Sequence, residues 1–193
     1  MAEVTTKYSP MHIDCTVGQP YGNIDSSYTC GFHTGADFPE TGTSEQNPAL
    51  YSITDDGIVT YVYKESTGTT PALGNQVQIL DNRTGLYYRY CHILYGSITL
   101  NIGDTVNSNT IIGKMGNTGN STGTHLHLEA TTKQPWACEN FVDPLEPLGI
   151  PNIRGTIVKY EETPTPPTPI TIKKKGFNWV VFTNKIRNRR NNF

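Results

Sequence analysis

The amino-acid sequence predicts an all-β protein, an antiparallel β-sandwich or open barrel. Turn-forming segments such as GQPYG, DDG, NRTG and NIGD recur about every 10 to 15 residues, with short runs of alternating polarity between them. Charged residues make up only 17% of the chain, and no stretch has the spacing of an amphipathic helix. The 193 residues also include 18 glycines and 13 prolines, which favour tight turns.

Four segments have the alternating polarity of strands. They are residues 57–65 (GIVTYVYKE), 75–82 (NQVQILDN), 86–94 (LYYRYCHIL) and 124–131 (THLHLEAT), and each predicts a strand of about five to eight residues. Residues 31–39 (GFHTGADFP) contain two glycines, which favours a looped turn there.

The chain divides into three predicted parts. Residues 1–150 form the β domain. Residues 151–172 form a Pro/Thr-rich linker, in which TPTPPTPI (163–170) is too rich in proline to pair in a sheet and favours a stiff spacer. Residues 173–193 form a basic aromatic tail, with an apolar strand over 177–183 between two basic runs.

Charge is distributed unevenly between these parts. Residues 1–160 carry 15 acidic and 8 basic side chains, a net of −7, whereas residues 161–193 carry 2 acidic and 7 basic ones, a net of +5. The body is therefore a poor binder of nucleic acid, and attraction to anionic polymers belongs to the tail. No apolar stretch reaches about 18 residues, so we expect no membrane span, and the start MAEVTTKYSP does not look like a secretory signal.

The cysteines allow three full disulfide pairings. They are Cys15, Cys30, Cys91 and Cys138. Because no secretory signal is predicted, we expect a reducing compartment and therefore free buried thiols.

Four of the five histidines lie in three short clusters: His33 with Asp37, His92 alone, and His125 with His127. Residues two apart on a strand point to the same face, so His125 and His127 should lie side by side while Leu126 and Leu128 point into the core. On a helix the two imidazoles would be about 200° apart. His12 has no such neighbours, and we assign it no role.

These residue types suit a zinc ion. A catalytic zinc takes three ligands, commonly neutral imidazoles and a carboxylate, and keeps a fourth position for water. Three clusters can supply three ligands and leave two histidines for proton transfer. Two neutral imidazoles and one carboxylate leave the site with a net charge of about +1, which lowers the pKa of bound water toward about 7. The pattern therefore predicts metal-dependent hydrolysis.

The motifs together resemble the lysostaphin and LytM type of zinc endopeptidases, which cleave peptide stems and cross-bridges of bacterial peptidoglycan. The resemblance covers roughly residues 10–148 and is carried, in the family's order, by GFHTGADF, ITDDGIVTYV, YYRYCHI, IGDTVNSNTIIGKMGNTGNSTGTHLHLEA and FVDPL. It implies one zinc ion bound by His33, Asp37 and His127. It also implies that His92 and His125 are the catalytic histidines that flank the open position.

The chain has no HExxH motif, so no glutamate is placed to act as general base. One histidine must then take the proton of the attacking water, and a second must stabilise the oxyanion or protonate the leaving amine. The bond that is cut stays open, since pentaglycine bridges and direct D-Ala–diamino acid links are both compatible with the sequence. We expect the loops at 38–50 and 131–142 to set this choice.

Other functions remain open. One is a catalytically silent protein that binds the wall or serves as a structural part of a phage tail, although all five site positions are present. Another is a D-Ala-D-Ala dipeptidase or carboxypeptidase, whose sites by resemblance carry a Glu three residues before a His, and this chain has no ExxH.

The expected setting is a phage virion tail or a phage lysin that acts on the host cell wall, because a secreted autolysin would need a secretory signal. The expected partners are bacterial peptidoglycan and, through the tail 173–193, anionic wall polymers or phage tail proteins. The oligomeric state stays open.

Overall fold

The computed structural model describes residues 2–134, 136–161, 170–174 and 177–181. Its strands are β1 (Glu3–Thr6), β2 (Cys15–Thr16), β3 (Gly35–Pro39), β4 (Ala49–Tyr51), β5 (Gly57–Tyr63), β6 (Asn75–Asp81), β7 (Tyr87–Ile93), β8 (Thr105–Val106), β9 (Ile111–Lys114), β10 (His125–Thr131), β11 (Phe141–Val142), β12 (Ile157–Tyr160), β13 (Ile170–Lys174) and β14 (Phe177–Val181). Three short 3-10 helices are η1 (Glu40–Gly42), η2 (Cys138–Asn140) and η3 (Glu146–Leu148). No α-helix occurs among the described residues, which confirms the predicted all-β class.

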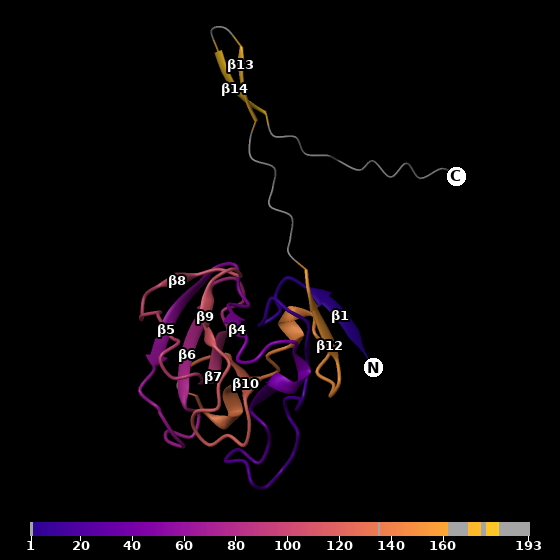
Figure 1. The fold of residues 1–193 in the computed structure, drawn as a ribbon, viewed down its shortest axis with the longest axis vertical. Coiled ribbons are helices and arrows are strands. Elements are labelled where there is room, and N and C mark those ends of the chain that lie inside the picture. Colours follow the sequence, from indigo (N-terminus) through magenta and orange to yellow (C-terminus); the bar gives the residue numbers. More distant parts are fainter. Residues whose placement is uncertain (1, 135, 162–169, 175–176, 182–193) are drawn as a thin grey trace, which may run out of the picture. The chain divides into compact units, whose positions relative to one another are not determined.

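A seven-stranded antiparallel sheet forms the centre of the body (Figure 1). Its order is β11-β10-β7-β6-β5-β8, and β3 pairs with β10 on the edge that β10 also shares with β11. The four longest strands of this sheet are β5, β6, β7 and β10. They are the four segments whose alternating polarity predicted strands, so that prediction is confirmed.

The side chains of strand β10 point alternately into the core and toward the polar face of the sheet. Leu126, Leu128 and Ala130 are fully buried and belong to the main hydrophobic cluster, as the alternation predicted. His125 and His127 alternate with them and therefore share the opposite face. The largest fully buried side chains of the same cluster include Tyr88, Tyr90, Phe38 and Met11.

The GFHTGADFP segment differs from its prediction. We expected a looped turn, but Gly35–Pro39 forms strand β3 and pairs with β10 over five residues. The looped part is confined to the residues before Gly35. Gly35 serves close packing rather than turning, because a Cβ at this position would lie 2.4 Å from the Leu128 carbonyl oxygen.

The folded body continues beyond the predicted boundary at residue 150. Strand β12 lies within the stretch 151–172 that we predicted as a linker, and it pairs parallel with β1 and antiparallel with β2. Val158 of β12 is fully buried, so apolar contact holds this segment on the body. A further two-stranded sheet joins β4 to β9, and the body as a compact unit spans Met1–Glu161.

A second compact unit spans Glu162–Phe193. Its described part is an antiparallel pair in which β13 meets β14, with Ile172 opposite Trp179. The apolar strand predicted over 177–183 corresponds to β14 as far as Val181. The spacer at 163–169 and the basic residues 182–193 lie outside the described residues.

Two of the four cysteines contradict the expectation of free thiols. Cys30 and Cys138 form a disulfide, with their Cα atoms 5.5 Å apart, whereas Cys15 and Cys91 are free and buried as expected. The pair is 108 residues apart in sequence, and only the folded body brings the loop before His33 next to η2. Nothing in the cysteine spacing indicated this contact.

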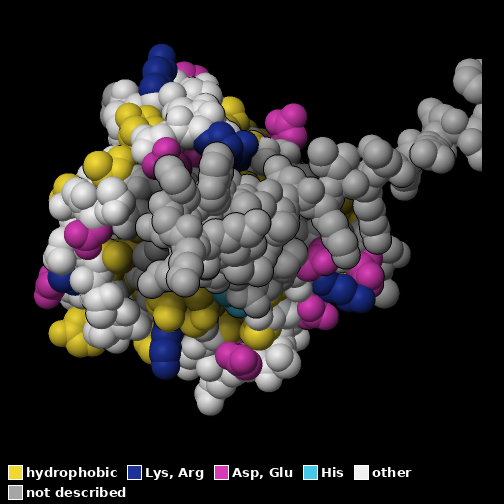
Figure 2. Space-filling view, turned by 90° about the horizontal axis from the view of Figure 1, so that it is seen from above, with side chains coloured by type: hydrophobic (Ala, Val, Ile, Leu, Met, Phe, Trp, Pro, Cys, Tyr) yellow, Lys and Arg dark blue, Asp and Glu magenta, His cyan; other side chains and the backbone are white. Residues whose placement is uncertain are grey.

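On the face in Figure 2, acidic and basic side chains of the described residues lie scattered among uncharged ones. Within the described part of the chain, no helix is long and apolar enough to cross a membrane.

Candidate active site

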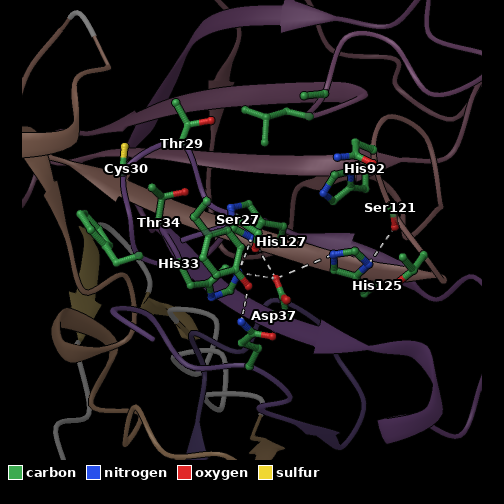
Figure 3. Close-up of a pocket in the computed structure, with 17 residues that line it drawn as sticks. Ser27, Thr29, Cys30, His33, Thr34, Asp37, His92, Ser121, His125 and His127 are labelled. Atoms are coloured by element: carbon green, nitrogen blue, oxygen red, sulfur yellow. Dashed lines mark hydrogen bonds and ion pairs between the residues drawn. The ribbon is translucent and has the colours of Figure 1, made fainter. Parts of the chain in front are cut away.

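Three predicted ligands converge at one point above the central sheet (Figure 3). His127 Nδ1 lies 2.9 Å from Asp37 Oδ1 and 3.1 Å from His33 Nε2. Asp37 Oδ1 and His33 Nε2 lie 3.2 Å apart. In the part of the chain that the structure describes, no other three His, Cys, Asp or Glu side chains form such a group.

This donor triangle fits a zinc ion. Tetrahedral zinc with bonds of about 2.0 to 2.1 Å holds its ligand atoms about 3.3 Å apart, close to the distances found here. Two imidazole nitrogens and one carboxylate oxygen are also the donor types of catalytic zinc sites. The arrangement can therefore hold one zinc ion and leave a coordination position open to the cavity.

Strand register brings two of the three ligands together. His127 on β10 lies directly opposite Asp37 on β3, so their side chains leave the same face of the sheet. His33 comes from the segment just before β3. Gly35 permits this approach, since a Cβ there would also lie 2.9 Å from Cε1 of His127.

His92 reaches the same cavity through a β-bulge. The register between β6 and β7 shifts by one residue near the end of β7, and His92 there has a φ of +60°. Its N–H bonds to the Leu73 carbonyl instead of a ladder partner. The bulge thus turns an imidazole out of the strand's alternation and toward the ligands.

His125 lies at the start of β10, beside His92. Its Nε2 is 3.8 Å from Asp37 Oδ1, and its ring centroid is 4.7 Å from that of His92. The fourth and fifth predicted site residues are therefore adjacent to the predicted metal ligands and to each other. Figure 3 shows both rings facing the space above Asp37.

Each of the four imidazoles uses its second nitrogen to bind a fixed acceptor. Three use main-chain carbonyls: His33 Nδ1 meets Pro20 O at 2.9 Å, His92 Nδ1 meets Thr118 O at 2.7 Å, and His125 Nδ1 meets Gly123 O at 2.8 Å. These bonds place the proton on Nδ1 and leave Nε2 free toward the cavity.

The two ring nitrogens of His127 have the reverse arrangement. Its Nε2 lies 3.1 Å from Oε1 of Glu129, so Nδ1 is the nitrogen that faces the ligand triangle. Glu129 is almost completely buried, with 1% of its surface exposed. Glu129 was not among the predicted site residues, although its position two after His127 on a strand puts both side chains on one face.

The charges of the site follow from burial and these contacts. Burial first, and then the neighbouring His125, lower the pKa of His92 to about 4, so His92 is neutral at neutral pH. Burial opposes ionisation of Asp37, but its bonds to His127 and His33 hold the pKa of this carboxyl well below its ordinary value. For Glu129, burial is likewise outweighed by His127 and Arg89, and its pKa is about 2.

A cavity of about 450 Å³ opens over these residues. Its walls are parts of segment 19–34 together with 72–73 and 120–122. A second cavity of about 430 Å³ shares Asp37 and His125 and continues the space toward Pro39–Thr41. Of the loops expected to set specificity, 38–50 lines the second cavity. The loop 131–142 is joined by the Cys30–Cys138 disulfide to Cys30, which lines the first cavity.

The fifth histidine lies elsewhere. His12 stacks between Tyr51 and Tyr160, with ring centroids 3.5 and 3.8 Å away, and its Nε2 meets the Ser108 carbonyl. This placement outside the cavity agrees with its exclusion from the predicted site.

Comparison with known proteins adds a family match. The model of peptidase family M23 matches residues 31–139, more than half of the chain and a span that contains all five site residues.

Solved structures agree with this match. The catalytic domain of the antimicrobial peptidase lysostaphin from Staphylococcus simulans is 25% identical, with a TM-score of 0.56, and the match covers 70% of this chain and 92% of that one. LytU is 25% identical, with a TM-score of 0.52 and coverage of 68% and 83%. The catalytic domain of the prophage-encoded M23 protein EnpA from Enterococcus faecalis, in a mutant form, is 28% identical, with a TM-score of 0.52 and coverage of 67% and 88%.

Proposed function

The chain belongs to peptidase family M23, and on this basis we propose that it is a zinc-dependent endopeptidase that hydrolyses peptide stems or cross-bridges of bacterial peptidoglycan. The observation that carries the proposal is the meeting of His33 Nε2, Asp37 Oδ1 and His127 Nδ1 within hydrogen-bond distance of one another, beneath an open cavity. These three residues would hold the zinc ion.

A bound zinc ion supplies Lewis-acid chemistry, which polarises a carbonyl group and lowers the pKa of water. The chain's own histidines handle the proton. His92 and His125 each present a free Nε2 lone pair to the cavity, because their Nδ1 atoms donate to carbonyls. In our proposal one of them accepts a proton from the attacking water as the water oxygen bonds to the peptide carbon. The C–N bond then breaks, and the amine nitrogen receives a proton from this histidine pair.

Isolated cell walls of several chemotypes test the proposal. We expect the zinc-loaded protein to release new amino groups, and mass spectrometry of the products will identify the bond that is cut. A chelator should stop the release, and added zinc should restore it. Wall binding without new amino groups would instead support the silent, wall-binding alternative.

The setting and the tail are further parts of this proposal. A phage virion or lysin role is supported by the likeness to EnpA, a protein described as prophage-encoded. Detection of the chain in purified particles would identify a virion protein.

Deletion of residues 162–193 should leave cleavage of a small soluble peptide unchanged. If the tail binds anionic wall polymers, the deletion should weaken salt-sensitive binding to whole walls, and if it binds tail proteins, it should change the assembled mass.

A further inference from the structure

Glu129 supplies the carboxylate among the groups that contact the second nitrogens of the site histidines; Ser121 Oγ, 3.2 Å from His125 Nδ1, is a further side-chain contact. Pro20, Thr118 and Gly123 contribute main-chain oxygens, which no substitution of their side chains removes. The acceptor for His127 can be removed by a single substitution. His127 therefore differs from the other three site histidines, because its second nitrogen faces a side-chain carboxylate whereas each of theirs faces a main-chain carbonyl.

Glu129 is itself fixed on both oxygens. Oε1 accepts a hydrogen bond of 2.6 Å from the hydroxyl of Thr34, the residue after His33, besides facing His127 Nε2. Oε2 accepts a hydrogen bond of 2.7 Å from Nε of Arg89, and Nη2 of the same guanidinium lies 2.5 Å from it. The Arg89 guanidinium lies 3.8 Å from the ring centroid of Trp136. The carboxylate thus joins the segments that carry two of the three proposed zinc ligands.

We infer that Glu129 is a positioning residue for the metal: it accepts the Nε2 proton of His127, which keeps the Nδ1 lone pair free and aimed at the zinc ion. This inference rests on the proposed zinc site. Arg89 holds the carboxylate through its two contacts to Oε2, which do not depend on Thr34, so the orientation of the imidazole is set before the metal binds. A carboxylate acceptor also makes the imidazole a more basic ligand than a carbonyl acceptor does.

Substitution of Glu129 by Gln tests the inference with little change in volume. An amide cannot satisfy both sides. If its oxygen faces Arg89, its NH₂ faces His127 and favours a proton on Nδ1; if its oxygen faces His127, two donors oppose each other at Arg89. We expect Glu129→Gln to bind zinc about 10- to 100-fold more weakly than the unsubstituted protein. The measurement is competition for zinc against a chelator of known affinity.

Thr34→Val is the matched control. It also removes a partly buried hydrogen bond to Glu129 and should lower thermal stability, but it leaves the His127 contact in place. We expect its zinc affinity to stay within about threefold. Nitrogen NMR of the imidazoles supplies a second readout: His127 should carry its proton on Nε2 in the zinc-loaded protein, and the Nε2 proton signal should shift in Glu129→Gln only.

The outcomes separate this inference from the proposed function. If the unsubstituted protein binds no zinc, or Asp37→Ala binds it equally well, the zinc site itself is wrong. If zinc binds the unsubstituted protein tightly, Asp37→Ala loses it and Glu129→Gln retains full affinity, then Glu129 has no positioning role. If Thr34→Val loses as much zinc affinity as Glu129→Gln does, general destabilisation explains both losses, and the inference is overturned as well.

Discussion

The floor and the walls of the main cavity are built in different ways. The floor consists of strands β3, β7 and β10, where register places Asp37 opposite His127 and a bulge turns His92 toward them. The walls are loops from segments 19–34, 72–73 and 120–122, and one of them is tied by the Cys30–Cys138 disulfide. The floor carries Asp37, His92, His125 and His127, whereas the walls, apart from His33 just before β3, carry none of the predicted site residues.

This difference indicates which properties the floor and the walls each determine. Strands fix the positions of the donor atoms through hydrogen bonds that extend across the sheet. Loops can change in length and sequence without disturbing that register. We therefore expect substitutions on the floor to change metal binding and turnover, and substitutions on the walls to change stability and substrate choice.

The largest expected effect is on the floor, from Asp37→Ala. This variant removes the anionic ligand and should lose most of the bound zinc together with all measurable activity. The protein should still fold, because the buried core of the sheet does not include Asp37. Zinc content by atomic absorption and circular dichroism of the same sample check both parts. Full zinc and full turnover in this variant would refute the ligand assignment.

Loss of either proton-transfer histidine should be smaller and confined to turnover. We expect His92→Ala and His125→Ala to retain zinc and to lower kcat by about 10²- to 10⁴-fold, the usual cost of removing a positioned acid or base. The measurement is kcat on a peptide substrate, with zinc content as the control. If one of these variants loses zinc but keeps its residual rate, the substituted histidine is a zinc ligand and not a proton-transfer residue.

Removal of the disulfide in the wall should lower stability and leave zinc binding unchanged. The Cys30–Cys138 bond closes a loop of 108 residues, and its loss in Cys30→Ser/Cys138→Ser should lower the free energy of unfolding by about 2 to 5 kcal/mol. Zinc affinity should be unchanged at temperatures where the variant is folded. Urea denaturation and chelator competition measure the two quantities. A large fall in zinc affinity would show that the walls also position the metal.

The pH dependence of stability gives a finer test of the floor. The folded-state pKa of His92 is about 4, below its ordinary value of about 6.5, so the unfolded chain takes up the proton first as the pH falls. The metal-free protein should therefore lose about 3 kcal/mol of stability at this residue between pH 7 and pH 4. His92→Gln cannot titrate and should lose correspondingly less. Equal slopes for the two proteins would contradict the buried, neutral state of His92.

The floor was more predictable from the sequence than its supports. Alternation of apolar and polar residues located β5, β6, β7 and β10, and the spacing of two placed His125 and His127 on one face. Alternation is a local signal, and each of these strands is long enough to show it. The strand at Gly35–Pro39 was missed, since glycines there reflect contact with β10, which is distant in sequence.

Contacts across long sequence separations account for the remaining differences. The acceptor carbonyls of Pro20, Thr118 and Gly123 leave no signature, because any residue supplies a carbonyl. Glu129 could have been noticed from its place in the HLHLE motif, but its partner Arg89 lies on another strand. The same holds for β12, whose pairing with β1 joins the two ends of the body.

The backbone of His92 bears on how inactive relatives of such a protein can arise. A left-handed φ of +60° costs an ordinary residue about 1 kcal/mol or more, whereas glycine adopts it without a steric penalty. At this position His92→Gly should therefore be more stable than His92→Ala. Glycine would therefore be the substitution that replaces the imidazole at the smallest backbone cost, and it would remove the proposed proton transfer while leaving His33, Asp37 and His127 in place.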